Sequence, residues 1–127
     1  MMSRIEHFAV YAENPDALKN FYVGALGLHV IFENPGPPPA YFLADDHGMA
    51  IEVLARPEGE TNANQRWICH FAFWVDDFIS MHDQLNRIGV VFEEETLVET
   101  DDLKTAFFKD PSGNRCQIVW RRKQLGA

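Results

Sequence analysis

The sequence contains an internal duplication. Residues 7–10 (HFAV) recur as residues 70–73 (HFAF), and each copy lies in an alternating apolar segment that predicts a strand. Residues 42–53 also align without a gap on residues 107–118. Two similar halves are expected to fold as two similar supersecondary units, so a prediction for one half can be checked in the other.

Each of these strands is followed by a predicted helix. The first helix begins at Asn14, a capping residue, and Pro15, which suits the first helical position, and it ends at Gly27. The second begins near residues 76–77 and ends at Gly89, as a glycine C-cap would. Apolar residues repeat at helical spacing in both, namely Leu18, Phe21, Tyr22 and Ala25, then Phe78, Met81, Leu85 and Ile88.

Three more strands are predicted after each helix. They cover about residues 28–33, 40–44 and 49–55 in the first half and about 90–94, 103–109 and 114–120 in the second. The pattern predicts an α+β fold of two tandem βαβββ modules. Within a single domain spanning residues 1–127, we expect a first module (about 1–56), a polar connector (57–66), a second module (67–120) and a tail (121–127).

Composition excludes several classes of protein. The chain has no run of about 18 apolar residues to cross a bilayer, and its net charge of −8 disfavours nucleic-acid binding. Cys69 and Cys116 form no disulfide framework, and apolar alternation begins at once, without a signal peptide, so we expect a cytoplasmic protein. The acidic run at residues 93–95 is predicted to be solvated.

Alternation along the strands indicates which polar residues share a face. His7 and Glu52 fall opposite Val10 and Val53, which suit the helix-covered core, and His70 and Gln117 are placed likewise in the second half. If the duplication relates the two sheets by a pseudo-two-fold axis, these four residues converge. Two imidazoles, a carboxylate and an amide oxygen suit a divalent Zn, Ni, Fe, Co or Mn ion. The alternative is a cleft that binds a ligand without metal.

Other residues are weaker candidates. Tyr11 and Trp74 share the open faces and are candidate substrate contacts, although aromatic residues in strands usually pack. Arg115 lies on the Gln117 face, where it would pair with a substrate carboxylate or phosphate, or else be a rim arginine in water. Three further histidines are interpreted as surface residues without partners: His29, His47 and His82.

Two motifs carry a family resemblance. Residues 21–28 (FYVGALGL) are similar to an FY-x-x-x-LGL helix end, and residues 110–114 (DPSGN) to a DPxGN turn. With the paired halves, the whole chain resembles the vicinal oxygen chelate superfamily, which includes glyoxalase I, bleomycin-resistance proteins and extradiol dioxygenases. The resemblance implies a vicinal-oxygen-chelate-type cleft, a homodimer, and metal ligands on the first and fourth strands of each module: His7, Glu52, His70 and Gln117.

The resemblance also implies a reaction. A glyoxalase-like member would be a metal-dependent lyase or isomerase that moves a proton in a small α-oxygenated carbonyl compound or thiol adduct. Most metal-dependent members carry glutamate where this chain has Gln117. We therefore predict that Glu52, at the mirror-related place, is the catalytic base.

Two other functions are consistent with the same residues. One is a non-catalytic protein resembling bleomycin-resistance proteins, in which an acidic cleft sequesters a cationic small molecule. The other is an Fe(II)-dependent dioxygenase, whose two-His-one-carboxylate triad would require Glu52 as the carboxylate.

Overall fold

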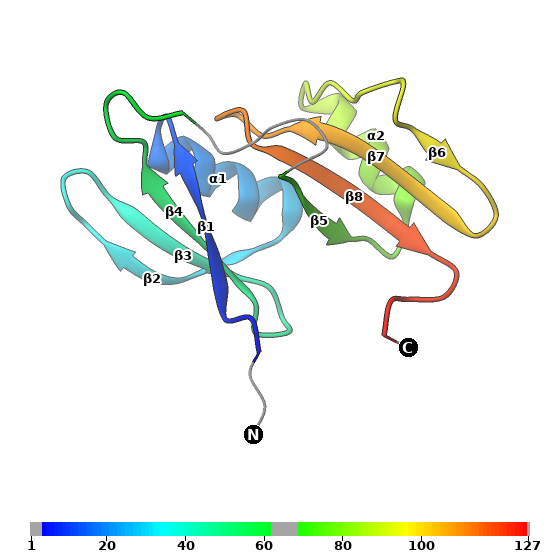
Figure 1. Ribbon diagram of the computed structural model, residues 1–127, viewed down its shortest axis with the longest axis horizontal. Coiled ribbons are helices and arrows are strands. Elements are labelled where there is room, and N and C mark those ends of the chain that lie inside the picture. The colour runs from blue at the N-terminus through cyan, green and yellow to red at the C-terminus, as the bar shows by residue number, and fades with distance from the viewer. Residues whose placement is uncertain (1–3, 62–68, 127) are drawn as a thin grey trace. The chain divides into compact units, whose positions relative to one another are not determined.

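The computed structural model describes residues 4–61 and 69–126, which form two compact units. The first unit contains β1 (His7–Ala12), α1 (Pro15–Leu26), β2 (His29–Asn34), β3 (Ala40–Ala44) and β4 (Ala50–Ala55) (Figure 1). Its four strands form one sheet in the order β1-β4-β3-β2, in which β1 and β4 are parallel and the other neighbours antiparallel.

The second unit repeats this plan. It contains β5 (Phe71–Trp74), α2 (Phe78–Arg87), β6 (Val98–Glu99), β7 (Leu103–Lys109) and β8 (Arg115–Arg121), with the sheet order β5-β8-β7-β6. Here too the first and last strands are parallel. The predicted α+β fold of two βαβββ modules is confirmed. The predicted connector is described only as far as residue 61, and residues 62–68, including the start of the predicted second module, lie outside the described residues, as does residue 127 of the tail.

The helices begin and end where the sequence predicts. The Asn14 side chain accepts a hydrogen bond from the backbone of Ala17, and Gly27 ends α1 in the left-handed conformation, with φ of 74°. Asp77 caps α2 in the same way, and α2 ends at Arg87, just before Gly89 with φ of 95°. In the described residues, no helix is both long and apolar enough to span a bilayer.

Each helix covers one face of its own sheet. α1 packs on β3 and β4, and α2 packs on β7 and β8 (Figure 1). In β4 and β8, the residues predicted to face the helices are buried: Ile51, Val53, Cys116 and Ile118. The opposite faces of the same strands carry Glu52 and Gln117, which are only partly buried.

One predicted strand is wrong. Residues 90–94 do not form a strand, because only Phe92 makes a bridge, to Phe108, and the chain then turns at Glu94 before β6 begins at Val98. The prediction that the acidic run at residues 93–95 is solvated is also wrong for Glu93. Glu93 turns its carboxylate inward to Arg115, with 2.8 Å between its Oε2 and the Arg115 Nε.

His82 also differs from the prediction. Its ring stacks on that of Phe92, with centroids 4.1 Å apart and planes at 15°. His82 is therefore a packing residue between α2 and the following segment. His29 and His47 are exposed, as expected for surface residues, although His29 has a partner, since its Nδ1 lies 3.9 Å from a carboxylate oxygen of Asp46.

The duplicated turns use the same hydrogen bonds. In the second unit, the Asp110 carboxylate accepts from the backbone of Ser112 and Asn114 and from the Asn114 side chain. In the first unit, Asp45 accepts from the backbone of His47 and Met49. These aspartates fix the hairpins that lead into β4 and β8.

We expect Asp110→Ala to lower the free energy of unfolding by about 1–3 kcal/mol, because buried N–H donors lose their acceptor. Asp46→Ala is the control, since its side chain is 92% exposed and its change should be within about 0.5 kcal/mol. Urea denaturation measures both. Equal effects of the two substitutions would mean that the turn does not depend on the buried carboxylate.

A polar clamp holds α1 to β3. The hydroxyl of buried Tyr41 donates to the Asp16 carboxylate in the first turn of α1, and Lys19 Nζ lies 5.2 Å from the centroid of the Tyr41 ring. The hydrogen bond to Asp16, then burial and the negative charges of Asp16 and Glu33, raise the pKa of Tyr41 to about 12. The clamp therefore needs a protonated tyrosine.

We predict that one tyrosine titrates at about pH 12 when the ultraviolet absorbance of the folded protein is followed, and that Tyr41→Phe removes this step. Asp16→Asn should return it toward the ordinary value of about 10. Because the folded-state pKa is raised, the contribution of the clamp to stability is complete below about pH 10 and is lost toward pH 12. A wild-type titration without the late step, while circular dichroism shows a folded chain, would contradict the clamp.

Candidate functional site

The first unit brings His7 and Glu52 together on the open face of its sheet. His7 is the first residue of β1, and Glu52 lies in β4 beside Ala9, so both side chains project from the same face. The His7 Nε2 atom is 3.7 Å from Glu52 Oε1. The His7 side chain is 35% exposed and that of Glu52 25%, so solvent or a small molecule can reach both.

Two neighbours orient the His7 ring. Its Nδ1 atom lies 2.7 Å from Glu6 Oε1, and the Phe42 ring packs edge-to-face against it at 5.1 Å and 84°. Phe42 in β3 is the cross-strand partner of Glu52. The imidazole therefore has a carboxylate near each of its two nitrogens, Glu6 near Nδ1 and Glu52 near Nε2.

The second unit contains an equivalent arrangement with one change. His70 directly precedes β5, and its ring packs against that of Phe107 at 5.1 Å and 79°. Gln117 in β8 is the cross-strand partner of Phe107 and takes the place that Glu52 has in β4. Its amide nitrogen donates to the hydroxyl of buried Thr105. The second unit thus has a neutral, hydrogen-bonded amide where the first unit has a carboxylate.

Sequence reasoning missed the two phenylalanines that back the histidines. Phe42 and Phe107 occupy equivalent places in the gapless alignment of the two halves, so the signal was present. Side-chain alternation identified the polar residues of the open faces, but it gave no reason to single out one apolar neighbour. In the structure each ring packs against the histidine of its own unit.

Arg115 is buried, and the alternative of a rim arginine in water is wrong. Only 2% of the residue is exposed, and its Nε and an Nη bond the two Glu93 oxygens at 2.8 and 2.9 Å. Its guanidinium carbon lies 3.8 Å from the centroid of the Phe107 ring. The hydrogen bond to Glu93 raises the pKa of Arg115 above its ordinary value.

The two aromatic candidates have different surroundings. Tyr11 in β1 is partly buried and pairs with Leu54 across the strands. Trp74 at the end of β5 is 39% exposed, and its indole nitrogen donates to Asp76 at 3.1 Å. Trp74 therefore offers more free surface to a ligand than Tyr11 does.

With this geometry in place, comparison with known proteins identifies the family. The sequence profile of the Glyoxalase/Bleomycin resistance protein/Dioxygenase superfamily matches residues 4–118. The chain belongs to this superfamily. The duplicated βαβββ units are the fold that the superfamily uses, and its members include both enzymes and binding proteins, so membership alone does not fix an activity.

Individual members of the superfamily differ in function. The chain is 25% identical over 121 residues to biphenyl-2,3-diol 1,2-dioxygenase 3 of Rhodococcus globerulus, and the match covers 91% of this chain and 62% of that relative. It is similar in structure to TnmS3, an antibiotic-binding protein of Streptomyces sp. CB03234, with a TM-score of 0.73, 20% identity, and 94% and 97% of the two chains covered. The trypanothione-dependent glyoxalase I of Leishmania major gives a TM-score of 0.75 at 19% identity, over 93% and 86%.

Superfamily members are often metal-dependent, so the donor atoms matter. The structure brings His7 and Glu52 together, and it places His70 and Gln117 around Phe107. Within residues 4–61 and 69–126, no group of three or more His, Cys, Asp or Glu side chains is arranged to hold a metal ion. The set of four ligands stays a prediction.

Proposed function

We propose that the chain is a metal-dependent enzyme of glyoxalase-like type. In this proposal, it is a lyase or isomerase that transfers a proton in a small α-oxygenated carbonyl compound or its thiol adduct. The observation that carries the proposal is the His7–Glu52 pair, in which a reachable carboxylate lies 3.7 Å from an imidazole nitrogen on the open face of the sheet.

The side chains fit a divalent metal ion. When Nδ1 of His7 donates to Glu6, its Nε2 lone pair and the Glu52 carboxylate face the same space, and a cation there relieves their repulsion. The imidazole of His70 and the amide oxygen of Gln117 would add two neutral donors. Such a mixed N/O set suits Zn, Ni, Fe, Co or Mn, and the bound ion would acidify a C–H beside a substrate carbonyl.

Glu52 is assigned the proton transfer. Glutamate can accept a proton from carbon and return it to the neighbouring carbon, whereas the amide of Gln117 cannot. The 25% exposure of the Glu52 side chain leaves it accessible to a substrate. Phe42 packs against His7 and keeps it oriented beside Glu52 while the proton moves.

We expect tag-free protein to retain about one tightly bound divalent metal ion per site, and the double variant His7→Ala, His70→Ala to lose it, because two imidazole ligands are removed. The matched control is His29→Ala, His47→Ala, which removes two exposed histidines and should keep the metal. Elemental analysis provides the readout. If wild-type protein holds no metal even after reconstitution, the enzyme proposal fails.

Glu52→Gln should abolish proton transfer and largely spare metal content, since it removes the base but keeps an oxygen donor. The assay is deuterium incorporation from D2O into an α-hydroxy ketone such as hydroxyacetone, followed by NMR. Glu58→Gln, in an exposed loop, is the control. Unchanged exchange in Glu52→Gln would exclude Glu52 as the base, whatever the metal content.

A non-catalytic ligand-binding protein is the second candidate. One observation that favours it is Gln117, whose amide donates to Thr105 and stands in the second unit where the first unit has a carboxylate. The other is the similarity to an antibiotic-binding protein. The net charge of −8 suits a cationic ligand. Calorimetric titration of metal-free protein with bleomycin tests this candidate. Saturable binding by protein that holds no metal and shows no turnover would favour a ligand-binding function.

Dioxygenase chemistry is the third candidate, favoured by the match to a dioxygenase of which this chain spans 62%. His7, His70 and Glu52 would form the Fe(II) triad. Oxygen consumption by the Fe(II)-loaded protein with a catechol would distinguish it from proton transfer.

We also propose that the two modules form one domain and that the protein is a cytoplasmic homodimer.

A further inference from the structure

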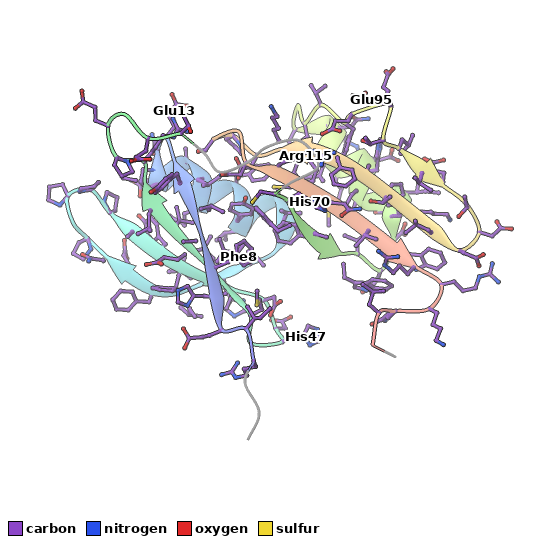
Figure 2. The ribbon with its side chains drawn as sticks, viewed as in Figure 1. Phe8, Glu13, His47, His70, Glu95 and Arg115 are labelled. Atoms are coloured by element: carbon purple, nitrogen blue, oxygen red, sulfur yellow. The ribbon has the colours of Figure 1, made fainter. Side chains whose placement is uncertain are left out.

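A chain of contacts in the second unit connects a buried ion pair to His70. Arg115 donates two hydrogen bonds to the Glu93 carboxylate, of 2.8 and 2.9 Å. The guanidinium carbon of Arg115 lies 3.8 Å from the centre of the Phe107 ring. The Phe107 ring packs edge-to-face on His70 at 5.1 Å. Each of the four residues comes from a different segment of this unit, with Arg115 at the start of β8 and His70 just before β5 (Figure 2).

Glu93 acts on Phe107 twice. Its backbone N–H donates to the Phe107 carbonyl at 2.9 Å, and its carboxylate fixes the guanidinium that covers the Phe107 ring. A cation over an aromatic face is attracted to it, and more strongly when water is excluded, as it is for an arginine that is 2% exposed. Both the backbone and the ring of Phe107 are therefore held.

The strands of the first unit carry no arginine at the place that corresponds to Arg115. Ala50 stands at the place in β4 that corresponds to Arg115 in β8, although Phe42 packs on His7 as Phe107 packs on His70. The two histidines differ in their backbone support. His7 is paired with Ala50 in the ladder, whereas His70 precedes the first paired residue of β5. The histidine that lies outside the ladder is the one whose ring neighbour is clamped.

We propose that Arg115 is a positioning residue that orients the His70 imidazole by fixing the Phe107 ring. Glu93 serves to hold the guanidinium, and neither residue touches a ligand itself. This role is separate from the proposed reaction, because it concerns the orientation of His70 in the metal-free protein. It differs from the predicted role of Arg115 as a direct substrate contact.

The test uses the metal-free protein and the double variant Glu93→Gln, Arg115→Met. Removing both charges together avoids leaving one buried charge without its partner, and Met keeps much of the arginine volume. The expected result is a shift of the His70 ring proton signals toward those of free histidine in two-dimensional NMR, with the His7 signals unchanged. His7 is an internal control, because Ala50 stands in its unit at the place that Arg115 occupies in the other.

Two further variants keep the test decisive if the double variant unfolds. Phe107→Leu should shift the His70 signals in the same way, and combining it with Arg115→Lys should add no further shift. Arg115→Lys keeps the cation but loses the two-pronged contact, and it should give an intermediate shift.

Unchanged His70 signals in any of these variants, in protein that circular dichroism shows to be folded, would overturn the proposal and leave Arg115 with a purely structural role. The result can be read whether or not the protein binds metal. Failure of the proposed reaction is therefore distinguishable from failure of this inference.

Discussion

Parallel pairing of the first and last strands is the constraint on which each unit depends. It places β4 and β8, the last strands of their units, in the middle of the sheets. A central strand has ladders on both sides, so a slip of one residue would exchange the side chains of its two faces. The same pairing therefore fixes the burial of Val53 under α1 and the position of Glu52 beside His7.

Much of this fold is predictable because its signals are local. A capping side chain, a proline and a glycine define α1 within its own sequence, and the turn aspartates bond backbone atoms only two to four residues away. The duplication allows each local signal to be checked in the second copy. Alternation then predicts that His7 and Glu52 share a face, because the periodicity of a strand needs no knowledge of the partner strand.

Features that depend on distant partners were not predictable in the same way. Glu93 and Arg115 are far apart in the sequence, and alternation places Arg115 on an open face without indicating that a loop carboxylate will cover it. The β pattern of residues 90–94 is likewise local, and it did not indicate that this segment pairs with β7 through the single bridge of Phe92 to Phe108. Phe42 and Phe107 were overlooked because an apolar residue in a strand looks the same whether it backs a histidine or fills a core.

The Arg115–Glu93 pair also constrains how the two halves could have diverged. Arg115 is 2% exposed, whereas the Glu93 side chain is 20% exposed. An arginine acquired first would have been buried without a counter-ion, at a cost of about 3–5 kcal/mol, while a glutamate acquired first would have stayed partly hydrated. A path on which Glu93 comes before Arg115 therefore avoids an unpaired buried charge, and the first unit, with Ala50 at this place, has no such dependence.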